Sequence, residues 1–186
     1  MREITRDQRF DEILGLIPEE ARTAVDVGCG ISFRDVYVKS GRRFDRVLGL
    51  NVHAPSIWDL TSELRESHPH YSFICADATE YPFDTEFDVA TLLAVAEHFT
   101  LYDLTKLLDR LTACCGTVVL ETPEQYEPNE WAVKAFDNPH ERHLSLVTAE
   151  FLSQWSFRPA ARYWLESGFS DCIYVRSEHE RNPGSV

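Results

Sequence analysis

The chain has 186 residues, of which 44% are hydrophobic, and this is enough apolar material for one domain with a sizeable core. The net charge of −13 disfavours a polyanionic partner such as a nucleic acid, although the same excess of carboxylates is also typical of an ordinary soluble protein. No stretch reaches the roughly 20 apolar residues of a membrane-spanning helix. The charged N-terminus has no apolar export signal, so we expect a cytoplasmic protein.

Strand-like and helix-like segments alternate along the chain. The first helix is predicted over residues 5–17, inside an N-terminal segment 1–22, and Pro18 ends it. Strands are predicted at 23–27, 46–50, 71–75, 87–93 and 116–121, and further helices at 101–113 and 148–155. Several of the strands are almost wholly apolar, as strands buried on both faces of a parallel sheet are. The pattern therefore predicts an open α/β sheet with right-handed crossovers.

The C-terminal part of the chain allows two interpretations. Residues 161–166 and 171–176 form a β-hairpin in the interpretation that we favour, because the second run then has a neighbour to pair with. In the other, residues 159–168 form a helix that begins at a proline and ends at a glycine. Residues 177–186 are polar and predict a frayed tail.

The cysteine pattern favours buried free thiols. The chain has an odd number of cysteines and lacks a Cys-x-x-Cys pair, which disfavours a zinc or redox motif. The five are Cys29, Cys75, Cys114, Cys115 and Cys172.

A glycine motif follows the first predicted strand. Residues 24–27 run directly into Gly28 and Gly30, which allow a sharp turn and a close approach of a ligand to the main chain. Asp26, two positions earlier, suits a ligand with hydroxyls or a cationic amine better than one with phosphates. A dinucleotide fingerprint needs a third glycine where this chain has Phe33, which weakens the alternative of a nicotinamide-dependent oxidoreductase.

Other polar residues follow the next strands, at the sheet edge where ligands bind in open α/β folds. Asn51 lies 21 residues after Gly30, about the interval at which a ribose-binding side chain follows a glycine turn. Asp77 follows the third strand and can accept a hydrogen bond from an exocyclic amine such as that of adenine.

At this point the chain resembles the class I S-adenosylmethionine-dependent methyltransferases. Four segments match in order: Val-Asp-Val-Gly-Cys-Gly (25–30), Gly-Leu-Asn-Val (49–52), Ala-Asp-Ala-Thr-Glu-Tyr-Pro-Phe (76–83), and the fourth strand with its Glu-His sequel (87–99). Glu-Thr-Pro (121–123) with a later Asn-Pro…His-x-Ser loop is similar to a bacterial and archaeal subgroup of the type 11 kind.

The resemblance implies a Rossmann-like, mostly parallel sheet of seven strands with an antiparallel last strand and helices on both faces. It also implies a single methyltransferase domain, 1–186, that binds S-adenosylmethionine. The expected cofactor-binding residues are Asp26, Gly28, Cys29, Gly30, Asn51, Val52, Asp77, Ala78, Ala94 and Glu97. Members of the family usually have Asp or Glu in place of Asn51, so the chain departs from the pattern there.

Two histidines are candidates for the base that takes a proton from the methyl acceptor. His98 at the end of the fourth strand is the first, and His143 is the second. Each has a structural alternative, as a core or capping histidine or as a loop anchor together with Ser145. His140, Glu141 and His143 also suggest a metal site, but the spacing lacks a third ligand at a defined offset, and we predict no metal.

The long connection 122–148 is the expected acceptor-binding element, since it exceeds ordinary loop lengths. Its aromatic residues, Tyr126, Trp131 and Phe136, contact the acceptor or, alternatively, cover the sheet edge. We expect a small-molecule acceptor, methylated in line at an oxygen or nitrogen atom. A non-catalytic cofactor-binding protein or partner subunit on the same fold is the alternative. The oligomeric state cannot be read from the sequence.

Overall fold

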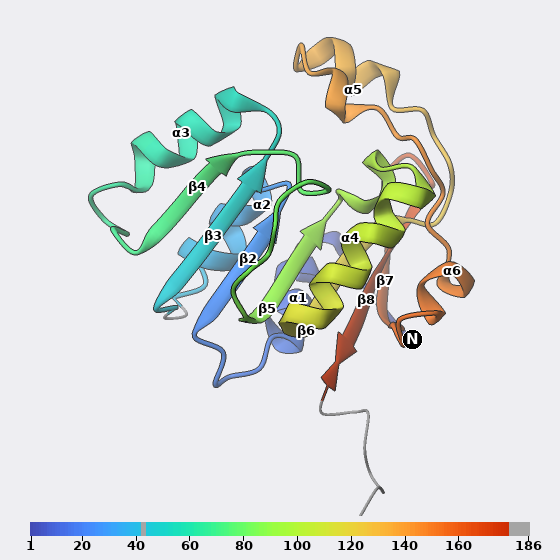
Figure 1. Ribbon diagram of the computed structural model, residues 1–186. Coiled ribbons are helices and arrows are strands. Elements are labelled where there is room, and N and C mark those ends of the chain that lie inside the picture. The colour runs from blue at the N-terminus through green and yellow to red at the C-terminus, as the bar shows by residue number, and fades with distance from the viewer. Residues whose placement is uncertain (42–43, 179–186) are drawn as a thin grey trace, which may run out of the picture.

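The computed structural model describes residues 1–41 and 44–178, and it shows an open β-sheet between two layers of helices (Figure 1). Within these residues the strands form one eight-stranded sheet in the order β1-β7-β8-β6-β5-β2-β3-β4. The strands are Arg2–Ile4 (β1), Thr23–Val27 (β2), Arg46–Asn51 (β3), Tyr71–Cys75 (β4), Phe87–Leu93 (β5), Cys115–Pro123 (β6), Arg158–Trp164 (β7) and Ser170–Ser177 (β8). All five strands expected from the apolar runs are confirmed, as is the α/β fold.

Strand β8 is antiparallel to both of its neighbours, β6 and β7, and the other pairs of strands are parallel. The antiparallel last strand is therefore confirmed, but the expected number of seven strands is wrong. The additional strand is β1, which pairs in parallel with Ala161, Arg162 and Tyr163 of β7. Without it, β7 would expose an unpaired edge, and pairing with the N-terminal residues satisfies these backbone groups.

Helices cover both faces of the sheet, as expected. They are Arg9–Leu16 (α1), Ile31–Phe33 (α2), Ala54–Leu64 (α3), Leu101–Cys114 (α4), Glu130–Ala135 (α5) and Ala149–Ser153 (α6), with short helical turns at Arg6–Gln8 (η1), Arg34–Val38 (η2), Ala96–His98 (η3) and Pro139–Glu141 (η4). One hydrophobic core joins the sheet to α4 and α6, and a second joins its other face to α1, α2 and α3. Within the described residues, no helix has the length and apolar character needed to cross a membrane.

Local sequence signals explain the helix boundaries. The hydroxyls of Thr100 and Thr148 accept hydrogen bonds from the third residues of α4 and α6, which satisfies a free N–H group at each start. The first helix is shorter than the predicted 5–17, because residues 2–4 are extended in β1 and a 3₁₀ turn precedes Arg9.

The C-terminal hairpin is confirmed, and the alternative helix over residues 159–168 is wrong. Residues of β7 pair with β8 around the turn at Gly168, and a bulge between Pro159 and Ala161 accommodates the proline, which has no N–H to donate. Ser177 still belongs to β8, Glu178 follows it, and residues 179–186 of the predicted tail lie outside the described residues.

The cysteines are free, as expected, but not all are buried. Cys29, Cys115 and Cys172 are buried, whereas Cys114 is half-buried and Cys75 is exposed. The prediction of burial was wrong for Cys75 because β4 is the edge strand of the sheet. One neighbour is missing there, so the end of the strand faces solvent.

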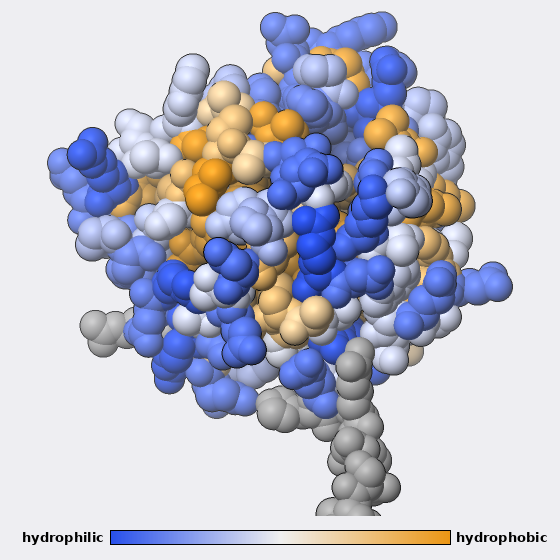
Figure 2. All heavy atoms as spheres, in the orientation of Figure 1, coloured by the Kyte–Doolittle hydropathy of each residue, from blue (hydrophilic) through white to orange (hydrophobic). Residues whose placement is uncertain are grey.

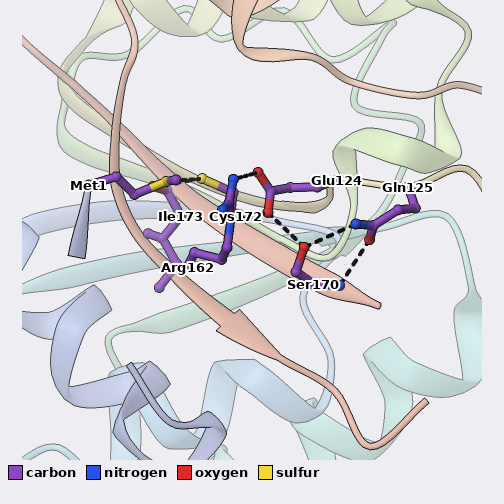
Figure 3. A network of polar contacts seen from close by, with 7 residues as sticks. All are labelled: Met1, Glu124, Gln125, Arg162, Ser170, Cys172 and Ile173. Carbon is purple, nitrogen blue, oxygen red and sulfur yellow. Dashed lines mark hydrogen bonds and ion pairs between the residues drawn. The ribbon is translucent and has the colours of Figure 1, made fainter. Parts of the chain in front are cut away.

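A polar network fixes the start of the long connection after β6 (Figure 3). Glu124 forms an ion pair with Arg162 of β7 and accepts a hydrogen bond of 2.7 Å from the Ser170 hydroxyl. The Gln125 amide donates to the same hydroxyl at 3.2 Å, and its oxygen accepts from the Ser170 N–H at 2.9 Å. The connection therefore leaves the sheet in a defined direction before it crosses the carboxyl ends of the strands.

Candidate active site

A cleft of about 590 Å³ lies at the carboxyl ends of β2, β3, β4 and β5. This volume is within the range of about 300–1,000 Å³ that is usual for small-molecule sites. Of the predicted site residues, seven line the cleft: Gly28, Asn51, Val52, Asp77, Ala78, Ala94 and His98. Five others do not: Asp26, Cys29, Gly30, Glu97 and His143.

Gly28 is the residue of the glycine turn for which the structure requires the absence of a side chain. Its φ is +75°, which side chains disfavour, and a Cβ here would lie 2.3 Å from Cγ2 of Val95. The N–H groups of Gly28 and Cys29 both donate to the carbonyl oxygen of Leu50, at 2.7 and 2.9 Å. By contrast, a Cβ on Gly30 would meet nothing closer than 3.8 Å. The turn is thus held tightly between β3 and Val95, and it leaves main chain exposed to the cleft.

Asp26 lies below the turn, in the sheet, and is only 3% exposed. The Thr91 hydroxyl donates a hydrogen bond of 2.5 Å to its carboxylate, and the Tyr37 hydroxyl lies 2.8 Å from that of Thr91. Burial raises the pKa of Asp26 to about 7, against the opposing effect of the Thr91 hydrogen bond. The Asp26 side chain is therefore tied to Thr91 of the neighbouring strand β5, inside the protein and below the glycine turn.

Asn51 ties the second strand to the glycine turn. Its amide donates to the carbonyl oxygen of Cys29 at 2.8 Å, and its side-chain oxygen accepts from the N–H of His53 at 2.8 Å. The Cys29 side chain is buried and packs under Gly49, where a Cβ would come within 2.8 Å of the sulfur. Cys29 is thus placed as a packing residue, while Asn51 both lines the cleft and braces its floor.

Asp77 and Ala94 occupy the ends of the two outer strands of the cleft. One carboxylate oxygen of Asp77 accepts from the N–H of Thr79 at 2.8 Å and from its hydroxyl at 2.7 Å, which closes the turn after β4. Ala94 has a φ of +55°, an uncommon conformation for a residue with a side chain. Its N–H donates to the carbonyl oxygen of Glu121 at 3.0 Å, and this bond holds the strained position. Such strain is often found at functional sites.

His98 and His143 come together although they lie far apart in the sequence. Nδ1 of His98 forms a hydrogen bond of 3.1 Å with the carbonyl oxygen of Arg142, the residue before His143. The two imidazole rings lie 5.0 Å apart between centroids, at an angle of 70°. Burial lowers the pKa of His98, and it lowers that of His143 to about 4 with a contribution from His98. Both rings are therefore neutral near pH 7.

Glu97 completes this group and is 3% exposed. Burial, together with the nearby carboxylates of Asp171 and Glu121, raises its pKa to about 8. The groups of Glu97, His98 and His143 that could bind a metal all lie within 4.8 Å of one another. The sequence singled out His140, Glu141 and His143 for this possibility. The structure instead brings His143 to the Glu-His pair after β5, because Leu144 and Ser145 donate backbone hydrogen bonds to the Glu97 carbonyl oxygen at 2.7 and 3.2 Å.

The sequence predicted that the connection 122–148 contributes to the site, and it named His140 and Glu141 only as possible metal ligands. It did not single out the other lining residues on the far side of the cleft, which are Asn138, Pro139, Arg142 and Leu144 of the long connection, and Thr100 and Asp103 at the start of α4. A signal for part of this side was present in the sequence. The N-cap Thr100 follows directly after His98 and Phe99, and the first turn of a helix that starts at a strand end lies beside the ligand site. Tyr126, Trp131 and Phe136 are exposed, at 53%, 62% and 55%, and do not line the cleft.

Fold and site together define an α/β protein with a ligand cleft at the carboxyl ends of its parallel strands. Residues 24–117 match the family model described as "Methyltransferase domain", which covers half of the chain. The chain belongs to this family and is a class I S-adenosylmethionine-dependent methyltransferase. The expected enzyme class and cofactor are thereby confirmed.

Solved structures show the same fold at low sequence identity. The N-methyltransferase NodS from Bradyrhizobium japonicum WM9, in complex with S-adenosyl-L-homocysteine, is 12% identical, with a TM-score of 0.69 over 98% of this chain and 89% of that chain. Magnesium protoporphyrin IX methyltransferase (ChlM) from Synechocystis PCC 6803, also with bound S-adenosylhomocysteine, is 15% identical, with a TM-score of 0.65 over 91% and 82%. The small RNA methyltransferase HEN1 is 20% identical, with a TM-score of 0.66 over 94% of this chain and 25% of that chain. No curated protein matches the sequence significantly.

The cleft is suited to the cofactor of this family. The Gly28 turn leaves main chain accessible at the end of β2, and Asn51, Asp77 and Ala78 offer polar and apolar surface at the ends of the next two strands. Asp77 is exposed, and only one of its carboxylate oxygens is used by the turn at Thr79, so the other can accept a hydrogen bond.

Proposed function

We propose that this methyltransferase acts on a small molecule and methylates it at an oxygen or nitrogen atom. The observation that carries the proposal is the position of His98, which lines the same cleft as the strand ends. We call the wall formed by Gly28, Asn51, Asp77 and Ala94 the cofactor side of the cleft, and the wall formed by residues 138–142 and Leu144 the acceptor side. His98 lies where the two sides meet, at the end of the turn after β5.

The cofactor side supports binding of S-adenosylmethionine in an extended form across three strand ends. In this proposal the amino-acid portion lies at Gly28 and Gly30, above the buried Asp26. The ribose lies at Asn51 and Val52, and the adenine lies near Asp77 and Ala78. Ala94 and the Glu97 turn border the sulfur, and Cys29 contributes only through the packing of the turn.

When bound, S-adenosylmethionine supplies a methyl group that is already activated by the positive charge on sulfur. The protein must therefore orient the acceptor for in-line attack at short distance and exclude water. A hydroxyl or protonated amine must also lose a proton, and the neutral imidazole of His98 accepts it. His143, in contact with the His98 ring, fixes the ring that carries this proton.

The charge distribution favours an uncharged or cationic acceptor over a nucleic acid. The cleft is bordered by the acidic residues Asp77, Asp103 and Glu141, and Arg142, which also lines it, forms an ion pair with Glu130 at 3.1 Å. Hydrophilic residues cover most of the face shown in Figure 2, and the chain carries a net charge of −13. A polyanion would meet repulsion both at the surface and in the cleft, which supports a small molecule although one structural relative is described as an RNA methyltransferase.

The acceptor side supports the proposal that residues 122–148 bind the acceptor. Asn138 is buried at the cleft, where its side-chain oxygen accepts from the N–H of His140 at 3.1 Å and its amide donates to Glu141 at 3.0 Å. This turn holds residues 138–142 against the cleft. The exposed Trp131 and Phe136 lie on and beside α5, from which they can close over a bound acceptor.

Transfer of label from methyl-labelled S-adenosylmethionine tests the proposal. The protein is incubated with three separate pools: a metabolite mixture, total RNA and denatured protein. We expect label in the metabolite pool, and a loss of roughly 10²- to 10⁴-fold in rate for His98→Asn, which is the usual contribution of a general base. The variant should bind S-adenosylhomocysteine as the wild type does. Label that enters only RNA or protein would contradict a small-molecule acceptor.

A further inference from the structure

The three residues Glu97, His98 and His143 form a compact group of two imidazoles and one carboxylate. Glu97 and His98 belong to the turn η3 directly after β5, and His143 comes from the long connection. The backbone bonds of Leu144 and Ser145 to the Glu97 carbonyl oxygen, at 2.7 and 3.2 Å, hold the two segments together. Main-chain hydrogen bonds therefore fix the relative positions of the segments that carry the three side chains.

Both imidazoles interact with the backbone. Nδ1 of His98 lies 3.1 Å from the carbonyl oxygen of Arg142, and its ring also interacts with the backbone of Ala94. The ring of His143 interacts with the backbone of Glu127. A carbonyl oxygen can only accept, so Nδ1 of His98 carries the proton and its Nε2 keeps a lone pair. Histidines that bind metals in proteins almost always donate their other N–H in this way, which fixes the ring and raises the basicity of the ligand nitrogen.

Glu97 supplies the independent observation that points to a ligand. Its side chain is buried, with 3% of the residue exposed, and its Oε2 has no hydrogen-bond partner of normal geometry among residues 1–41 and 44–178. The Thr122 hydroxyl is near enough to lower the pKa of the carboxyl group, against the larger effect of burial. A buried carboxyl oxygen without a partner is costly, because it has lost its water and gained nothing in exchange. A cation bound next to the two imidazoles removes this cost, and the Glu97 carboxyl group releases its proton to solvent as the ion binds.

We propose that Glu97, His98 and His143 bind one divalent transition-metal ion at the wall of the cleft. Nitrogen and carboxylate ligands together suit Zn²⁺, Mn²⁺, Fe²⁺ or Co²⁺ better than Ca²⁺ or Mg²⁺. Donor atoms bound to one ion at about 2.1 Å lie at most about 4.2 Å apart. The potential ligand atoms lie within 4.8 Å, so binding requires them to close by less than about 1 Å.

Three protein ligands leave positions of the ion open, as in catalytic rather than structural metal sites. Of the three proposed ligands, only His98 lines the cleft, so we infer that an open position of the ion meets the cleft beside His98. A catalytic role of the ion, unlike the metal site itself, rests on the proposed function. In this role the oxygen atom of the acceptor binds at an open position of the ion. The pKa of the acceptor hydroxyl then falls, and it loses its proton to water near neutral pH. In the metal-bound enzyme His98 then holds the ion and not the proton.

Titration with Co²⁺ of the full chain, first stripped of metal by a chelator, tests the site. Co²⁺ in a site with nitrogen ligands gives visible absorption bands that report both binding and geometry. We expect one equivalent to bind to the wild type. Loss of a residue that only hydrogen-bonds to a metal ligand typically weakens metal binding by roughly 10- to 100-fold. Glu97→Gln and His143→Ala remove ligands themselves, so they should weaken Co²⁺ binding by at least this factor.

His140→Ala is the matched control, because this exposed histidine lies three residues before His143 in the same segment but outside the group. It should bind Co²⁺ as the wild type does. Thermal unfolding and titration with S-adenosylhomocysteine, performed on every variant, show that the fold is intact. If Glu97→Gln or His143→Ala does not fold, the other of these two variants, together with the wild type and His140→Ala, still shows whether Co²⁺ binds at the three residues.

Two results would overturn the metal site. In one, the wild-type protein binds no stoichiometric Co²⁺; in the other, Glu97→Gln and His143→Ala bind it as tightly as the wild type. Binding of S-adenosylhomocysteine is measured in the same samples, with and without metal. A protein that binds S-adenosylhomocysteine and methylates a small molecule but binds no metal overturns the metal site alone. A protein that binds the metal but labels only RNA or protein overturns the proposed acceptor class and leaves the metal site standing.

Discussion

The two sides of the cleft are built in different ways. The cofactor side consists of the ends of four adjacent strands, whose turns are short and are fixed by backbone hydrogen bonds and by packing against the core. The acceptor side is part of a long connection that touches the rest of the protein at a few anchors, chiefly Glu124 and Gln125 on Ser170, and Leu144 and Ser145 on Glu97. The first side is therefore fixed by the fold, whereas the second can change in sequence with little effect on the core.

The largest expected effect comes from replacing residues 125–138 with a short Gly-Ser linker. The change removes α5, Phe136 and the anchor at Gln125, and it leaves the anchors at Glu124 and Leu144 in place. Turnover should be abolished, because the change removes Asn138, which holds residues 138–142 against the cleft, and the aromatic residues proposed to close over the acceptor. The affinity for S-adenosylhomocysteine should not change. Calorimetric titration and a methyl-transfer assay measure the two quantities separately. Persistent methylation would place the acceptor elsewhere, and a parallel loss of cofactor binding would remove the distinction between the two sides.

The next effect in size is expected for Gly28→Ala on the cofactor side. The new methyl group would lie 2.3 Å from Val95 at a φ of +75°. We expect a loss of about 2–5 kcal/mol in the free energy of unfolding, from left-handed strain of about 1–2 kcal/mol and overpacking of about 1–3 kcal/mol. Affinity for S-adenosylhomocysteine should fall with it, because the turn must move away from Val95.

Gly41→Ala is the matched control, since Gly41 also has a positive φ, +67°, but a Cβ at this position would have no neighbour within 4 Å among the described residues. It should lose only the strain of about 1–2 kcal/mol and should keep its cofactor affinity. Chemical unfolding of both variants measures the difference. Equal losses for the two variants would show that Val95 does not confine the turn.

Asp26→Asn tests whether the aspartate under the turn affects only the stability of the fold or also the binding of the cofactor. The folded pKa of about 7 lies above the ordinary value of 3.8, so the native state binds more protons than the unfolded state between these values. Stability should therefore fall as the pH rises from about 4 to 7 and then level off. The variant cannot ionise, so its stability relative to the wild type should increase over that range, by up to about 4 kcal/mol.

Unfolding experiments at pH 4 and pH 8 measure this change, and a difference that does not depend on pH would contradict it. Cofactor affinity at pH 8 decides the second question. A marked loss would mean that Asp26 reaches the cofactor amine despite its burial, as the sequence motif alone suggests. Unchanged affinity would assign the residue to the support of the turn through Thr91.

These two sides also differ in how far the sequence predicts them. The strand ends could be identified because each depends on a local apolar run followed by Gly28, Asn51, Asp77 or Ala94. Parallel strands place their carboxyl ends at one edge, so local signals were enough to bring these residues together. The same logic gave the hairpin of β7 and β8 but not β1, because a three-residue strand forms only where a neighbouring edge is open to it.

The group of Glu97, His98 and His143 could not be predicted because it depends on contacts without a periodic pattern. The bonds from Leu144 and Ser145 to the Glu97 carbonyl oxygen join an irregular loop to a turn, and no propensity or spacing rule indicates them. Histidine spacing therefore favoured His140 with His143, which are near in sequence. Cys75 shows the same limit, since its exposure follows from the position of β4 at the edge of the sheet and not from its apolar neighbours.

Asn51→Asp is expected to have the smallest effect and probes the departure of this chain from the family pattern. The Asn51 amide donates to the Cys29 carbonyl oxygen at 2.8 Å, and a carboxylate has no hydrogen to give. We expect a loss of about 1–3 kcal/mol in the free energy of unfolding, the usual cost of leaving such a group unpaired. Affinity for S-adenosylhomocysteine should change as well, because the side chain lines the cleft at the expected ribose position. Unchanged affinity in a calorimetric titration would remove Asn51 from the ribose site and would confine it to bracing the glycine turn.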